Sequence, residues 1–295
     1  MAAVFCGGTS ARYRFIEKLK EQLSVKSLCL WLGVSTSGYY AWRKRQLSDR
    51  SIEDAELKTV IKKIFDDNKG RYGSPRVFKA LIKQGYAISK KRVARLMKEL
   101  KLVGRVFRVT HRSPGLKRFL ASGENLRPQG GLPKEKNKIW VADVTYLKVS
   151  GRWQYLSVIM DLFSRKIISW SLDASRTAEV TKRSLIGAIR KRQPEAGLMI
   201  HTDRGVEYRG KVYQNELKRN GMVHSLNRAG QCTDNAHMES FFHSMKAELI
   251  GGNIFNNVLE LRYAVGNYIN KYYNAKRLHS GIDYCSPIEY ETLTA

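Results

Sequence analysis

The sequence predicts an all-α first half followed by a mixed α/β second half. Up to residue 116, apolar residues recur at helical spacing between capping serines and glycine turns, whereas β-rich apolar runs follow residue 139. Charge divides along the same line: residues 1–138 hold 32 Lys and Arg against 11 Asp and Glu, and residues 139–295 hold 21 against 15. We therefore expect the two halves to have different tasks.

The composition predicts a globular protein that binds a polyanion. The chain has 295 residues, a formal net charge of +27 and 43% hydrophobic residues, which excludes a disordered basic tail. Its four cysteines form no Cys-x-x-Cys pair, so we expect a reducing, cytoplasmic location. No apolar run approaches 18 residues, so we expect no membrane partner.

The segment from Ser24 to Arg45 predicts a helix-turn-helix unit. Gly33 supplies the turn, and Ser35 is placed to cap the second helix. The end of that second helix carries three candidate DNA contacts: Arg43, Lys44 and Arg45. Two helices joined by a glycine turn are also a common way for small helical domains to pack, so the pattern alone leaves both readings open.

A second helix pair is predicted between residues 51 and 116. Pro75 lies near the start of its first helix, Gly85 marks a turn, and Ser89 caps the next helix. The outer face of that helix carries further candidate DNA contacts: Lys90, Lys91, Arg92 and Arg95. Glycine and proline then interrupt residues 117–138. We therefore expect helical regions at 1–50 and 51–116, a basic linker at 117–138, and a catalytic core at 139–295.

The second half predicts a sheet covered by helices. Its expected strands and helices follow one another at residues 140–147, 155–163 and 166–172 (strands), 177–192 (helix), 198–202 (strand) and 212–220 (helix). Tight turns between the first three strands predict an antiparallel meander. The alternation of strands with helices predicts a mixed α/β domain.

Three acidic residues occupy positions that suit a metal site. Asp143 interrupts an apolar strand, Asp203 ends the fourth strand, and Glu239 lies within a helix expected at 234–246. Lys246 follows Glu239 by two helical turns, so we expect both on one helix face. Taken singly, Asp143 fits a strand-end cap, Asp203 an Asx turn and Glu239 a solvated helix position.

Three carboxylates together favour Mg²⁺ or Mn²⁺, which prefer hard oxygen ligands and keep positions open for phosphate oxygens. Two such ions can activate an attacking oxygen and stabilise a leaving oxygen in phosphoryl transfer. The three acids are therefore compatible with a two-metal site for phosphoryl transfer, and at this point the structural roles of the single acids stay open.

The spacing of these acids resembles a known signature. Sixty positions separate Asp143 from Asp203, and thirty-five residues lie between Asp203 and Glu239. Further motifs resemble the catalytic (OrfB-type) transposase of bacterial insertion sequences, and they lie at residues 70–76, 138–146, 201–205, 230–242, 272–280 and 286–290. The resemblance implies an RNase H-like core of the retroviral-integrase type, with Asp143, Asp203 and Glu239 as catalytic residues and ligands of two Mg²⁺ ions. It also implies that Lys246 contacts the DNA end.

The same resemblance implies partners. These are the terminal inverted repeats of an element, target DNA, further copies of the chain on that DNA, and a product of an upstream reading frame, because no four-heptad repeat is present here. His201-Thr-Asp-Arg-Gly205 departs from the usual His-Ser-Asp-Gln-Gly of the family. The sequence leaves two other functions open: a catalytically silent DNA-binding regulator, and a nuclease for RNA:DNA hybrids that would not need the basic half.

Histidine and tyrosine positions suggest weaker hypotheses. No two of His201, His237, His243 and His279 have the spacing of a zinc finger, so we expect no zinc site. A tyrosine stripe ends in Tyr268, Tyr272 and Tyr273, among the cations Lys271, Lys276 and Arg277. We expect Tyr268 in the core, and leave the other two tyrosines open between core packing and stacking on DNA.

Overall fold

A computed structural model describes residues 8–45, 48–105, 125–126, 131–228 and 235–294. The chain divides into two compact units, residues 1–63 and 64–295. Among the described helices, none has both the length and the apolar character that a membrane span requires. Most of the predicted linker, together with Cys6 and Cys232, lies outside the described residues.

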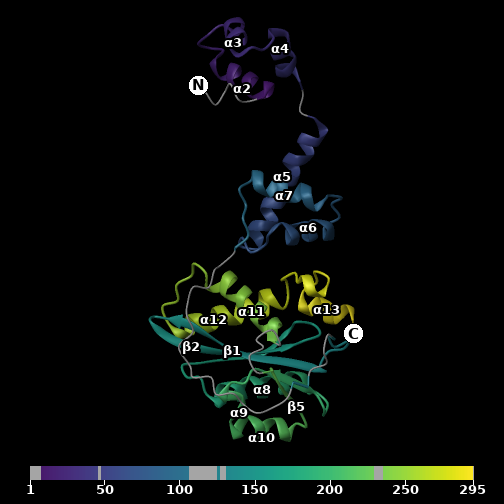
Figure 1. The fold of residues 1–295 in the computed structure, drawn as a ribbon, viewed down its shortest axis with the longest axis vertical. Coiled ribbons are helices and arrows are strands. Elements are labelled where there is room, and N and C mark those ends of the chain that lie inside the picture. Colours follow the sequence, from purple (N-terminus) through teal and green to yellow (C-terminus); the bar gives the residue numbers. More distant parts are fainter. Residues whose placement is uncertain (1–7, 46–47, 106–124, 127–130, 229–234, 295) are drawn as a thin grey trace. The chain divides into compact units, whose positions relative to one another are not determined.

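Three short helices pack around one small core in the first unit (Figure 1). They are α2 (Thr9–Leu19), α3 (Val25–Leu32) and α4 (Thr36–Lys44). The predicted cap at Ser35 forms, because Ser35 Oγ accepts from the amide of Gly38 at 3.0 Å. Ser24 caps α3 in the same way, since its Oγ accepts from the amide of Ser27 at 3.1 Å. Gly33 ends α3 in the left-handed region at φ 61°. The predicted helix-turn-helix is therefore confirmed as a local structure.

The next three helices are α5 (Asp49–Asp67), α6 (Ser74–Lys83) and α7 (Lys90–Glu99). Pro75 stands at the start of α6, and Ser89 Oγ caps α7 by accepting from the amide of Arg92 at 3.2 Å. Gly85 turns the chain between them at φ 88°. The predicted second helix pair is thus confirmed, while the long α5 was not singled out in the sequence.

A five-stranded sheet forms the centre of the second unit, in the order β3-β2-β1-β4-β5. Its strands are β1 (Ile139–Val149), β2 (Arg152–Asp161), β3 (Ile167–Asp173), β4 (Met199–Thr202) and β5 (Val223–Leu226). β1, β2 and β3 pair antiparallel, which confirms the predicted meander, and β4 and β5 run parallel to β1. The mixed sheet follows from the helix that intervenes before β4.

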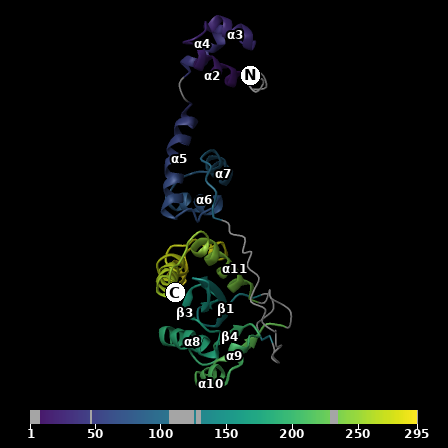
Figure 2. The ribbon, with the colours of Figure 1, turned by 90° about the vertical axis from the view of Figure 1, so that its left-hand side faces the viewer.

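Helices cover both faces of this sheet (Figures 1 and 2). One face carries α8 (Ala178–Arg192), α9 (Val206–Arg209) and α10 (Lys211–Arg219), and the other carries α11 (Ala236–Met245), α12 (Val258–Asn267) and the π-helical turns η2 (Lys246–Ile250) and η3 (Tyr268–Tyr273). Alternate residues of β1 serve the two cores: Trp140 and Ala142 pack with α8, and Val141 and Leu147 pack with α11. By this alternation, Asp143 lies on the same face of β1 as Val141 and Leu147.

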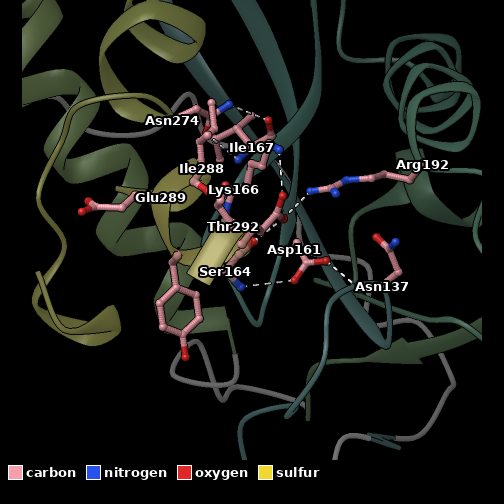
Figure 3. A network of polar contacts seen from close by, with 12 residues as sticks. Asn137, Asp161, Ser164, Lys166, Ile167, Arg192, Asn274, Ile288, Glu289 and Thr292 are labelled. Carbon is pink, nitrogen blue, oxygen red and sulfur yellow. Dashed lines mark hydrogen bonds and ion pairs between the residues drawn. The ribbon is translucent and has the colours of Figure 1, made fainter. Parts of the chain in front are cut away.

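A polar network fastens the C-terminal helix α13 (Pro287–Leu293) to the β2–β3 turn (Figure 3). Glu291 on α13 bonds Lys166 Nζ at 2.7 Å and Ser164 Oγ at 2.8 Å, and pairs with Arg192. Although burial raises the pKa of Glu291, these three donors lower it overall. The C-terminal segment is therefore an integral part of the core.

Candidate active site

The parallel register of β1 and β4 brings two of the predicted acids level with each other. Val141 on β1 pairs with His201 on β4, and two residues further along each strand lie Asp143 and Asp203. Because β4 ends at Thr202, Asp203 lies at the carboxyl end of that strand. Burial and the negative charge of Asp203 raise the pKa of Asp143 well above its ordinary value. The two carboxylates therefore lie within electrostatic reach of each other.

Backbone amides hold both carboxylates in place. The amide of Val144 donates to Asp143 Oδ1 at 2.7 Å, and the amide of Gly205 donates to Asp203 Oδ1 at 2.9 Å. Each aspartate keeps its second oxygen out of these bonds. Such fixed acceptors are suited to bind a cation without a large loss of side-chain entropy.

An ion pair that the sequence did not suggest lies beside the two aspartates. Arg176, in the loop between β3 and α8, donates from Nε and Nη2 to Glu207 Oε1 at 2.9 and 2.6 Å. Its Nη2 also lies 3.9 Å from Asp203 Oδ2. Burial raises the pKa of Glu207, and Arg176 opposes that shift. Glu207 stands only four residues after Asp203, but no pattern in the sequence links it to Arg176.

Gly205 is required between these acids for steric reasons. A Cβ atom at this position would lie 2.5 Å from Glu207 Oε1 and 2.7 Å from Glu207 Oε2, closer than real Cβ contacts allow. The Glu207 carboxylate thus occupies the space that a side chain at position 205 would fill. This explains the glycine of the Asp-Arg-Gly motif.

Glu239 lies on the helix that packs against β1, yet it is not gathered with the aspartates. Asn235 is the N-cap residue of α11 and donates from Nδ2 to the carbonyl of Ala142 at 3.2 Å, next to Asp143. Glu239 is exposed in the first turn of α11. Across the described ranges, no three His, Cys, Asp or Glu side chains lie close enough to hold a metal ion. The structure therefore brings together two of the three predicted ligands.

Lys246 lies at the β1 side of the same helix. It is the C-cap residue of α11 and the first residue of η2, and its Nζ lies 4.6 Å from the ring centroid of Tyr146. Burial lowers the pKa of Lys246, and the charge of Asp143 opposes that shift. Lys246 is half-buried whereas Glu239 is exposed, so the two side chains do not share one environment.

The other predicted DNA contacts lie on exposed helix surfaces. In unit one, Arg43, Lys44 and Arg45 are exposed at the end of α4, where Arg43 Nε lies 3.8 Å from Glu17 Oε1. On α7, Lys90, Lys91 and Arg95 are exposed, and Arg92 is half-buried. The opposite face of α7 is buried through Val93, Leu96 and Met97. Arg95 also pairs with Glu99 at 2.6 Å, and the role of these cations in DNA binding stays a prediction.

The tyrosine motif near the C-terminus is buried only in part, because Tyr272 is half-buried and Lys271 and Lys276 are exposed. Tyr268 and Tyr273 are core residues, which confirms the prediction for Tyr268. Arg277 is 5% exposed and bonds Glu248, while Tyr72 of the 70–76 motif accepts from the amide of Leu278 at 3.1 Å. Within the described residues, the buried members of these two motifs therefore serve packing.

Comparison with known proteins defines the class of this fold. The integrase core domain family matches residues 133–232, a second integrase core domain family matches residues 239–294, and an HTH-like domain family matches residues 51–109. The mixed sheet flanked by helices and these matches confirm the predicted RNase H-like fold with a preceding helical region. The protein is therefore of the integrase-core class.

Whole-chain relatives identify the family. The transposase InsF for insertion sequence IS3A of Escherichia coli (strain K12) is 37% identical over 286 residues, covering 95% of this chain and 98% of that protein. The transposase for insertion sequence element IS904 of Lactococcus lactis is 36% identical over 247 residues, covering 84% of this chain and 98% of that protein. The chain belongs to this family of insertion-sequence transposases, as the resemblance predicted.

Solved structures give more distant similarities. One is the simian T-cell lymphotropic virus intasome in complex with PP2A regulatory subunit B56 gamma, at 16% identity and a TM-score of 0.46, covering 78% of this chain and 74% of that chain. Another is the HTLV-2 integrase catalytic core domain in complex with magnesium, at 19% identity and a TM-score of 0.41, covering 52% of this chain and 96% of that chain.

Proposed function

We propose that this transposase cleaves and joins the DNA ends of its insertion sequence at a metal site formed by Asp143, Asp203 and Glu239. One observation carries the proposal: the parallel register of β1 and β4 sets Asp143 level with Asp203. Burial and, after it, the negative charge of Asp203 raise the pKa of Asp143, and a bound divalent cation would stabilise the ionised carboxylate against both effects. The donor set consists of carboxylate oxygens, so it fits Mg²⁺ or Mn²⁺.

Glu239 supplies the third carboxylate in this proposal. Its helix is fixed on β1 by the bond from Asn235 to Ala142, so the carboxylate stands on the element adjacent to Asp143. A change of rotamer moves a glutamate oxygen by several ångströms, and binding of a cation supplies the energy for that change. The family relationship supports a function in DNA transposition, and the position of Glu239 on this helix supports its role as a ligand.

The metal ions would polarise the phosphorus–oxygen bond and lower the pKa of the attacking water or 3′-hydroxyl. Asp143 and Asp203 hold the site in register through the backbone bonds from Val144 and Gly205. Lys246 places a positive charge near Asp143 and would contact the DNA end, since an ammonium binds phosphate as a point charge. Exposed cations on α4 and α7 would bind the backbone of the terminal repeats, with several copies of the chain and the upstream-frame product assembling on that DNA.

Strand joining in vitro tests the proposal. The purified chain is incubated with a labelled duplex that carries an element end, a target plasmid and Mg²⁺. Asp143→Asn, Asp203→Asn and Glu239→Gln should each abolish joining while DNA binding persists, because the metal ligands and not the phosphate-binding surface are changed. Asp173→Asn is the matched control, because Asp173 ends β3 in an exposed pair with Arg183. Joining at the wild-type rate by any of the three variants would remove that residue from the site.

The regulator hypothesis predicts a different outcome. A catalytically silent DNA-binding protein would bind the element end and give no joined product with either Mg²⁺ or Mn²⁺. The intact acids at all three positions favour the enzyme instead.

A further inference from the structure

Arg176 is held at the acid pair in one orientation. Both Nε and Nη2 donate to the same oxygen of Glu207, at 2.9 and 2.6 Å. A guanidinium fixed through two nitrogens loses the rotamer freedom that an arginine otherwise keeps. The side chain is 25% exposed, and its Nη1 makes no hydrogen bond to any described residue. Within the described residues, Nη1 therefore keeps its donors for a further acceptor.

Burying the carboxylate of Glu207 beside this arginine costs desolvation free energy. Its side chain is fully buried, Oε2 has no hydrogen-bond partner within the described residues, and Asp203 is close enough to raise the pKa of Glu207 further. A third buried carboxylate beside two others is costly unless it fixes a cation. The absence of a side chain at Gly205 leaves room for this carboxylate.

Arg176 lies near Asp203 but does not form a hydrogen bond with it, unlike an ordinary counter-ion. Nη2 lies 3.9 Å from Asp203 Oδ2, which is too long for a hydrogen bond, so this oxygen does not accept from the guanidinium. The positive charge still acts on both aspartates. Asp203 Oδ2 lies 3.9 Å from Nη2, and the charge of Arg176 opposes the upward shift of the pKa of Asp143. A fixed guanidinium that leaves the carboxylates available is suited to bind an anion next to them.

We propose that Arg176, oriented by Glu207, binds a non-bridging oxygen of the DNA phosphate that lies at the acid pair. This inference rests on the proposed function. Arg176 then contacts substrate, and Glu207 is a positioning residue that acts through it. A phosphoryl group in transfer carries charge on its equatorial oxygens, and a pre-oriented guanidinium stabilises that charge without reorganisation.

A phosphate scan tests this contact. Element ends are prepared with one neutral methylphosphonate at each terminal phosphate in turn, and the single-turnover rate of joining is measured with Mg²⁺. In the wild-type protein, neutralising the phosphate bound by Arg176 should slow joining. In Arg176→Ala, joining of unmodified DNA should fall about 100-fold, the usual loss for one transition-state donor, and the penalty at that position should disappear. Arg176→Lys should keep part of the penalty, because it retains charge without the fork.

Two further variants complete the design. Glu207→Gln keeps the arginine but weakens its anchor, so the same position should show a smaller penalty. Arg183→Ala is the matched control, because Arg183 on α8 is an exposed arginine paired with Asp173, and its scan should equal that of the wild type. Mn²⁺ affinity, measured by electron paramagnetic resonance, should change less than threefold in Arg176→Ala and Arg176→Lys.

The outcomes separate the two proposals. If the wild type joins no unmodified DNA end, the proposed function fails. If the wild type joins DNA and the scans of Arg176→Ala and Arg176→Lys match its scan at every phosphate, Arg176 contacts no phosphate and the inference is overturned. The inference is also overturned if Arg176→Ala loses joining and Mn²⁺ affinity in parallel while every methylphosphonate slows joining as in the wild type. Arg176 would then support only the metal site.

Discussion

Replacing Arg277 by methionine should destabilise the catalytic core, because the change strands a buried carboxylate. Arg277 and Glu248 are 5% and 4% exposed. Arg277 donates from Nε at 3.0 Å and from Nη2 at 2.8 Å to Glu248 Oε1, and from Nη2 to Ser244 Oγ at 2.9 Å. Methionine has a similar length and no charge. In the variant, Glu248 keeps the bond from Tyr268 but loses its cation.

The expected magnitude follows from this burial. Removing one member of a buried ion pair costs about 3–5 kcal/mol of unfolding free energy. For a domain of this size, each kcal/mol lowers the midpoint of thermal unfolding by roughly 2–4 °C, so we expect a shift of about 10 °C. Differential scanning calorimetry of the full chain measures it. Replacing both partners, as in Glu248→Leu with Arg277→Met, should recover much of the loss, because no unpaired charge is then buried.

An exposed ion pair supplies the control. Lys83 Nζ lies 2.8 Å from Glu289 Oε1, and both side chains are about 40% exposed. Lys83→Ala should therefore cost at most about 1 kcal/mol. An Arg277→Met midpoint within 2 °C of the wild type would refute the reasoning, since a pair so buried cannot be removed on one side without a measurable loss.

Three further predictions concern the site and the basic helices. Lys246→Ala should reduce end-specific cleavage with little change in Mn²⁺ affinity, and Lys246→Arg should restore part of it; wild-type cleavage at subsaturating DNA would exclude an end contact. Since the pKa of Asp143 is raised in the fold, the unfolding free energy of the metal-free protein should fall as pH rises above about 4 through that pKa, and Asp143→Asn should make this fall smaller in calorimetry, with the raised pKa values of Asp161 and Glu207 giving the remainder. Lys90→Ala or Lys91→Ala should lower the salt dependence of duplex binding by about one counterion each; an unchanged slope in fluorescence anisotropy would place the residue away from DNA.

Local chemistry made much of the fold predictable from the sequence. Ser35 and Ser89 cap helices where the pattern predicted caps, because a short polar side chain before an apolar helical run is suited to accept from the free amides of the first turn. The meander followed from strands separated by tight turns at Gly151 and Arg165, both at positive φ. Strand β5 was missed because its four residues carry no alternation strong enough to stand out.

The candidate site was predictable in part, and for a different reason. Asp143 could be found because it interrupts an apolar strand and Asp203 because it follows the end of one, and the sheet register then brings them together. Arg176 and Glu207 could not, because their pairing is a long-range contact between a loop and the short helix α9, and such a contact leaves no periodic pattern in the sequence. Arg277 was open between DNA contact and core, and only its bonds to Glu248 decide that it is buried.

Binding of Mn²⁺ to the full chain tests most directly whether Asp143 and Asp203 form one metal site. Electron paramagnetic resonance reports free Mn²⁺ during titration of the wild type, Asp203→Asn and the control Asp173→Asn. We predict that the wild type and Asp173→Asn bind Mn²⁺ alike, and that Asp203→Asn loses most of that affinity, because an amide cannot replace the anionic ligand. Equal Mn²⁺ affinity in Asp203→Asn and the wild type would contradict the account.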